Sequence, residues 1–99
     1  MIYLDNASTT PLDPEVLDAM TVYLKEEFGN PSSQHSAGRK TAVALLDARD
    51  KIAALAGCSS DEIYFTSGGT EAGNTALKGV CLARRGRGKH LVVSAIEHP

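Results

Sequence analysis

The feature that most constrains the fold is the order of elements predicted over residues 62–96. Residues 62–66 (EIYFT) have the composition of a strand, and residues 90–96 (HLVVSAI) contain an unbroken apolar run that favours a strand covered on both faces. Between them, a helix is expected to open at Thr70 and to close at Arg84, whose charge suits the negative end of the helix dipole. Strand, helix and strand over this length make one βαβ unit. The sequence therefore predicts an α/β fold with a mostly parallel sheet flanked by helices.

Two helices are expected before this unit. Asp13 and Pro14 form a typical helix start, and the apolar side chains that follow at steps of three and four continue to Gly29, which is expected to end the helix. The second helix is expected over residues 37–56, with Gly57 as its C-cap.

The domain organisation follows from these elements. Residues 1–60 are expected to form an arm and the first helices, and residues 61–99 the start of a larger domain. A short strand is also expected at residues 2–4. Because one βαβ unit cannot cover both faces of its own sheet, we interpret the chain as a piece of a larger protein.

Composition excludes several classes of protein. Of the 99 residues, 42% are hydrophobic and 22% are charged, which is ordinary for a globular protein and excludes a disordered tail. A net charge of −2 gives no general attraction to nucleic acid, and no apolar run approaches the ~20 residues of a membrane span. With no secretory signal at the start, we expect a cytoplasmic protein in which Cys58 and Cys81 are buried thiols.

The turn before the third expected helix is a candidate anion site. There, Gly68 and Gly69 follow a predicted strand, and Thr70 opens the helix. The first turn of a helix presents unpaired N–H groups to an anion, glycine permits close approach, and a hydroxyl adds a donor. The alternative is that the glycines only make the turn and Thr70 only caps the helix. Neither a Walker A loop nor a dinucleotide-binding glycine motif is present.

His98 is the second candidate. It follows the predicted strand 90–96, and ligands of open α/β sheets gather at the carboxyl ends of strands. If the two predicted strands are parallel, His98 and the glycine turn share one sheet edge, where an imidazole can stack on a planar ligand or move protons. The three scattered histidines of the chain lack metal-ligand spacing, so no metal site is expected.

Four sequence blocks together resemble a known family. They are YLDNASTTP at residues 3–11, FGNPSSQH at 28–35 with Gly38 and Arg39, IYFTSGGTE at 63–71 with Asn74, and SAIEHP at 94–99. The residues of these blocks and the order of the blocks along the chain resemble the N-terminal portion of cysteine desulfurases of the NifS/IscS-like branch. That family belongs to the class V aminotransferase group of fold-type I enzymes, which depend on pyridoxal 5'-phosphate (PLP).

The resemblance implies roles for individual residues. Gly69 and Thr70 match positions that hold the PLP phosphate. His98 matches the histidine that stacks on the pyridine ring and assists proton transfer, so it is the expected catalytic residue. Glu71 and Asn74 match motif positions interpreted as supports of the loop.

The resemblance also implies an activity and partners. The full-length protein would convert L-cysteine to L-alanine and hold the sulfur as an enzyme persulfide. It would act as a homodimer and pass the sulfur to an acceptor such as an iron–sulfur scaffold protein or a thiolation partner. The family's Schiff-base lysine, substrate-binding arginine and persulfide cysteine have no matching positions here, so the 99 residues alone are expected to be inactive. The alternatives are another class V enzyme (a transaminase or a selenocysteine lyase) and a truncated, non-catalytic structural or interaction module.

Overall fold

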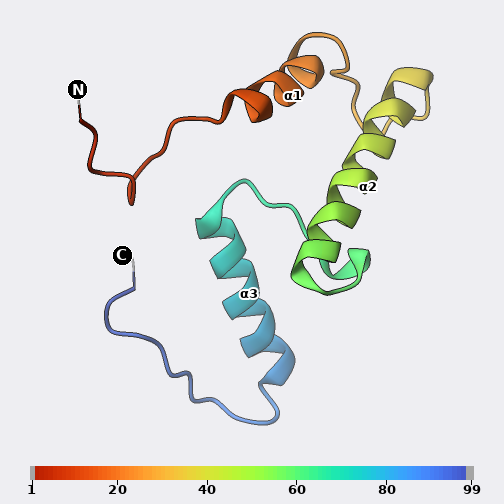
Figure 1. Ribbon diagram of the computed structural model, residues 1–99. Coiled ribbons are helices and arrows are strands. Elements are labelled where there is room, and N and C mark those ends of the chain that lie inside the picture. The colour runs from red at the N-terminus through yellow and green to blue at the C-terminus, as the bar shows by residue number, and fades with distance from the viewer. Residues whose placement is uncertain (1, 98–99) are drawn as a thin grey trace. The chain divides into compact units, whose positions relative to one another are not determined.

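The computed structural model describes residues 2–97 of the chain (Figure 1). Its elements, in chain order, are helix α1 (Pro14–Lys25), helix α2 (Ser36–Ala56), the short 3-10 helix η1 (Ser60–Glu62) and helix α3 (Gly69–Arg84). The chain divides into two compact units, Met1–Ile63 and Tyr64–Pro99. The first unit holds α1, α2 and η1, and the second holds α3 with the segments on either side of it.

Helix α1 begins where the sequence predicts and ends earlier. The Asp13 carboxylate accepts a hydrogen bond from the backbone N–H of Glu15 at 2.9 Å, which satisfies one of the unpaired donors of the first turn. The predicted end at Gly29 is wrong. The amides of Glu26 and Glu27 both donate to the carbonyl of Val22, at 2.9 and 3.0 Å, and this shared acceptor closes the helix after Lys25.

Helix α2 agrees with the sequence prediction to within one residue. At its start, Nδ1 of His35 accepts a hydrogen bond from the N–H of Gly38 at 3.2 Å. At its end, Gly57 adopts the left-handed conformation with φ 70° and ψ 33°, and the Cys58 amide donates to Ala53 O at 3.0 Å. The predicted C-cap at Gly57 is therefore confirmed, because this conformation is the one that glycine adopts without strain.

The loop between α1 and α2 lies against the first turn of α2. A Cβ added to Gly29 would lie 2.5 Å from Ala37 O. Within the loop, the amide of Ser32 donates to Asn30 Oδ1 and the amide of Ser33 to Asn30 O, both at 2.9 Å. These contacts leave no room for a side chain at residue 29, so backbone packing explains the glycine.

The predicted strands are absent from the described residues. Residues 2–4, 63–66 and 91–94 have neither helical nor strand structure, and Glu62 lies in η1, so the predicted strand start at residue 62 is wrong. A strand exists only through ladder hydrogen bonds to a neighbour. Because these segments form no strand ladder within residues 2–97, the parallel sheet stays a prediction.

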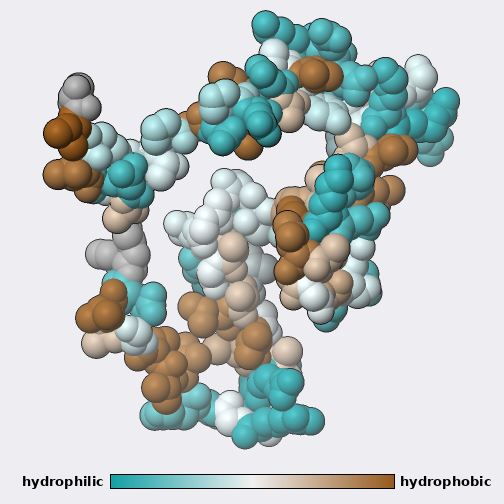
Figure 2. Space-filling model, in the orientation of Figure 1, coloured by the Kyte–Doolittle hydropathy of each residue, from teal (hydrophilic) through white to brown (hydrophobic). Residues whose placement is uncertain are grey.

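Few side chains of the described residues are buried. Gly38 and Ala53 are the buried residues of α2, whereas α1 and α3 have none. Figure 2 shows apolar side chains on the surface of α3 and of the segment that follows it. The expected burial of Cys58 and Cys81 is wrong, since both thiols are exposed. Cys81 lies on the apolar stripe of α3 and lines a hollow there together with His90 and Leu91 of the segment that follows the helix.

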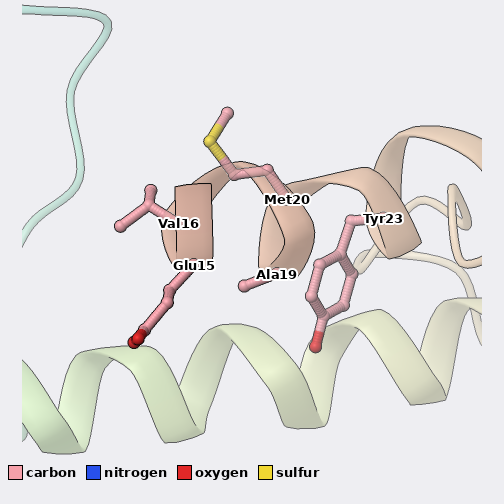
Figure 3. Close-up of a pocket in the computed structure, with 5 residues that line it drawn as sticks. All are labelled: Glu15, Val16, Ala19, Met20 and Tyr23. Atoms are coloured by element: carbon pink, nitrogen blue, oxygen red, sulfur yellow. The ribbon is translucent and has the colours of Figure 1, made fainter. Parts of the chain in front are cut away.

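The apolar stripe of α1 is only partly covered within its unit: Ala19 and Tyr23 line a second hollow together with Leu45 and Ala48 of α2. A hollow of about 440 Å³ lies along the helix, lined by Glu15, Val16, Ala19, Met20 and Tyr23. Figure 3 shows Glu15 and Tyr23 extending from one side of α1 and Met20 from another. About half of the surface of Val16, Met20 and Tyr23 is exposed. In the described part of the chain, no helix is both long enough and apolar enough to span a membrane.

Candidate functional site

The start of α3 presents unpaired backbone donors. Gly68, the N-cap, has extended backbone and no side chain to cap the helix, and the first intrahelical bond runs from Ala72 N to Gly68 O at 3.0 Å. The N–H groups of Gly69, Thr70 and Glu71 therefore precede the first helical hydrogen bond. Together with the dipole of the 16-residue helix, these donors favour an anion at this end.

A hollow of about 930 Å³ opens beside this first turn. From α3 it is lined by Gly69, Thr70, Gly73, Asn74 and Leu77, and from the C-terminal segment by Val92, Val93, Ser94 and Glu97. Its size suits a cofactor-sized ligand, and its walls combine apolar side chains with a few polar groups. The structure thus brings Gly69 and Thr70 to one hollow with the segment that immediately precedes His98.

His98 itself lies outside the described residues. Its predicted role on the cofactor ring therefore stays a prediction. Ser94 and Glu97 come shortly before His98 in the sequence and line the hollow. The sequence alone did not single them out as site residues. They belong to a block, SAIEHP, whose resemblance to the family was the only signal that pointed to them.

Two glycines leave the helix backbone open toward the hollow. Gly69 and Gly73 are four residues apart, so they lie on the same face of α3. A Cβ added to either would meet no atom within 4 Å, and both line the hollow. A cradle of bare backbone with N–H donors at one end and the Thr70 hydroxyl beside it fits a phosphate group, so the residues present fit PLP. The sequence alone assigned no role to Gly73.

Two hydrogen bonds, named here the Ser67–Glu71 latch, join the turn before α3 to the first turn of the helix. Oε2 of Glu71 accepts from the amide of Ser67 at 2.7 Å and from its hydroxyl at 2.6 Å. The Ser67 hydroxyl, and then its amide, stabilise the carboxylate and lower the pKa of Glu71 below its ordinary value of 4.5. The latch spans the Ser67–Gly69 turn, and neither of its two side chains lines the hollow.

Two further hydrogen bonds hold the same turn. The Thr66 hydroxyl donates to Gly68 O at 3.1 Å, and Nδ2 of Asn74 donates to Thr70 O at 2.9 Å. The first lies before the helix and the second within its first two turns. Glu71 and Asn74, which the family resemblance assigns to loop support, thus both bond within this region.

The other two sequence blocks lie in the first unit. In the block at residues 3–11, the hydroxyls of Tyr3 and Thr9 are 2.5 Å apart, and Ser8 Oγ donates to Asp5 Oδ1 at 2.9 Å. The block at residues 28–35 is the packed loop before α2. Across residues 2–97, no group of three or more His, Cys, Asp or Glu side chains is arranged to hold a metal ion.

Comparisons with known proteins agree on one group. A family model described as Aminotransferase class-V matches residues 2–99. The chain is 57% identical over 97 residues to the cysteine desulfurase IscS of Dictyoglomus turgidum and 50% identical over 97 residues to that of Methanosarcina thermophila. These alignments cover 98% of this chain, 25% of the first relative and 24% of the second.

A comparison with solved structures agrees with the sequence comparisons. The fold is similar to the solved structure of a NifS-like protein, with a TM-score of 0.78 and 40% sequence identity. The similarity covers 83% of this chain and 22% of that one. The chain therefore spans about a quarter of the length of the curated relatives it matches.

Proposed function

The chain belongs to the aminotransferase class V family, as its motifs indicate, and we propose that it forms the N-terminal part of a PLP-dependent cysteine desulfurase. In this role it supplies one wall of the cofactor site. The proposed overall reaction converts L-cysteine to L-alanine and leaves the sulfur as a persulfide on the enzyme. An iron–sulfur scaffold protein or a thiolation partner would then take the sulfur.

The observation that carries this proposal is the hollow shared by the first turn of α3 and the segment before His98. The N–H groups of Gly69 and Thr70, with the Thr70 hydroxyl, would hold the phosphate of PLP. His98 would lie against its pyridine ring and would hold or move a proton near the substrate. When bound, PLP serves as an electron sink for the amino-acid substrate, and the protein supplies placement and electrostatics.

The printed names of the relatives favour desulfurase over the other class V reactions. Both relatives described above are named cysteine desulfurase IscS, and the solved structure is named NifS-like. The proposed reaction also needs a Schiff-base lysine, a carboxylate-binding arginine and a persulfide cysteine from outside these 99 residues. We therefore propose that the 99 residues alone do not turn over cysteine, that the working enzyme is a homodimer, and that it acts in the cytoplasm.

The direct test is a chimera. In the Dictyoglomus turgidum relative, the quarter that aligns with this chain is replaced by residues 1–99, so that the rest of the enzyme is supplied by the relative. The chimera should retain PLP, seen as visible absorbance of the bound cofactor, and should release alanine from L-cysteine. The unaltered relative is the positive control.

Two results would contradict the proposal. A chimera with the circular dichroism and melting temperature of the relative that retains no PLP would show that these residues do not form the cofactor wall. A chimera that folds and binds PLP but releases no alanine from L-cysteine would show that these residues do not support the desulfurase reaction.

A further inference from the structure

Neither side chain of the Ser67–Glu71 latch contacts the hollow, yet the latch encloses the turn that shapes it. The latch joins the residue before Gly68 to the third residue of α3 through one carboxylate oxygen. Gly68 and Gly69, between them, have no side chains, and an added Cβ would meet nothing within 4 Å at either. Without the latch, this turn would keep the bonds that Thr66 and Ala72 donate to Gly68 O but would lose the two that fix Ser67. Glycine is the most flexible residue, so the loss would matter for the backbone of the diglycine turn.

The position of Glu71 on α3 determines whether its carboxylate can reach a ligand in the hollow. Successive residues of an α-helix are rotated by about 100°, so Glu71 lies about 200° around the axis from Gly69. The residues of α3 that line the hollow span the arc from Gly69, through Gly73, Leu77 and Thr70, to Asn74 at about 140°, and Glu71 is not among them. The carboxylate is therefore turned away from the hollow. It binds Ser67 without competing with a ligand for the donors that face the hollow.

We propose that Glu71 is a positioning residue: by holding both donors of Ser67, it fixes the diglycine turn so that the N–H groups of Gly69 and Thr70 face the phosphate of PLP. This inference rests on the proposed function. It assigns to Glu71 a role in affinity for the phosphate, exerted through Ser67. A carboxylate bonded to two donors holds the turn more firmly than a neutral group does, because hydrogen bonds to a charged acceptor are the stronger kind. Its lowered pKa is consistent with this, since the charged form is the one that the two donors stabilise.

The test uses the full-length chimera, freed of its cofactor, and separates the contribution of the ligand's phosphate from that of its ring. Cofactor-free protein is titrated with PLP and, separately, with pyridoxal, which lacks the phosphate. Glu71→Ala should weaken PLP binding by about tenfold and pyridoxal binding by less than twofold. The expected loss corresponds to about one hydrogen bond to the phosphate, which a disordered turn would no longer donate. Glu71→Gln, which keeps the shape and loses the charge, should give a loss of about threefold. Ser67→Ala should reproduce part of the effect.

A matched control is available in the first unit. There, Oε2 of Glu62 accepts a hydrogen bond from the amide of Ser59 at 2.9 Å, a similar contact outside the unit that carries the hollow. Glu62→Gln should leave both dissociation constants unchanged. This control separates a specific effect at the turn from a general effect of removing a carboxylate.

The outcomes are distinguishable. Equal loss of PLP and pyridoxal affinity in Glu71→Ala, or no loss of either, would overturn the positioning role while leaving the proposed function standing. Tighter PLP binding in Glu71→Ala would also overturn it, because Glu71 would then be a competitor of the phosphate. Failure of the unsubstituted chimera to bind PLP would refute the proposed function and this inference together.

Discussion

Gly38, in the first turn of α2, approaches the carbonyl oxygen of Asn30 so closely that a Cβ on residue 38 would lie 2.6 Å from that oxygen. The two residues belong to one sequence block of the family, and backbone contact explains why they occur together. Gly38 is also one of the two buried residues of α2. Close backbone packing between residues 28–33 and the first turn of α2 therefore fixes the conformation of the loop that leads into the helix.

The first prediction concerns this contact. Gly38→Ala should destabilise the first unit by about 1–3 kcal/mol, because backbone atoms must shift to admit the methyl group. Urea unfolding followed by circular dichroism measures the change. Gly79→Ala in α3 is the matched control, since nothing lies within 4 Å of its added Cβ, and it should stabilise the helix by about 0.5–1 kcal/mol. Equal effects of the two substitutions would contradict the close approach at residue 38.

The second prediction concerns the end of α2. Gly57 has open space around an added Cβ but a φ of 70°, so its role is conformational rather than steric. Gly57→Ala should cost about 1–2 kcal/mol, because a residue with a Cβ is strained in the left-handed region. Gly57→Asn should cost less, since asparagine adopts that region more readily. Identical urea midpoints for the alanine and asparagine variants would argue against the left-handed cap.

Helices were predictable because their signals are local. The Asp13 cap and the Gly57 terminus depend on neighbours within one turn, and the structure has both. The strands expected at residues 62–66 and 90–96 depend on partners elsewhere, and strand propensity alone does not supply the ladder. Cys81 was expected to be buried, yet its thiol is exposed, because the apolar stripe of a helix shows only which face can be covered and not whether a partner is present.

The third prediction concerns the pH dependence of the latch. Because Ser67 lowers the pKa of Glu71, the latch contributes stability above the ordinary value of 4.5 and loses it as pH falls through the lowered pKa. An NMR titration of the Glu71 carboxyl carbon should therefore have its midpoint below 4.5. Ser67→Ala removes the hydroxyl donor and should raise that midpoint. A midpoint unaffected by Ser67→Ala would mean that the hydroxyl does not bond to the carboxylate in solution.

The candidate site was partly accessible from the sequence. The glycine pair before Thr70 indicated an anion seat on physical grounds, and the structure places Gly69 and Thr70 at a hollow. The bare face at Gly73 was not predictable, because a glycine inside a helix normally signals nothing more than lower stability. The separation of Glu71 from the hollow could be seen only in the structure, since Thr70 beside it lines the hollow and Glu71 does not.

The fourth prediction concerns His98. In the chimera, His98→Ala should weaken the binding of both PLP and pyridoxal, since the imidazole is proposed to contact the ring that the two ligands share. Glu71→Ala is expected to affect PLP alone, so the two variants should differ in their ratio of affinities. A His98→Ala variant that loses PLP but keeps pyridoxal affinity would place the imidazole at the phosphate instead.

If the first turn of α3 holds the phosphate, Thr70→Ala in the chimera should raise the PLP dissociation constant. We expect a loss of affinity of about tenfold or more, because a hydrogen bond to a charged group contributes about 1.5–3 kcal/mol. Thr75→Ala, on the same helix but outside the lining of the hollow, should bind PLP like the unsubstituted chimera. Equal affinities for all three proteins would contradict this role of the first turn.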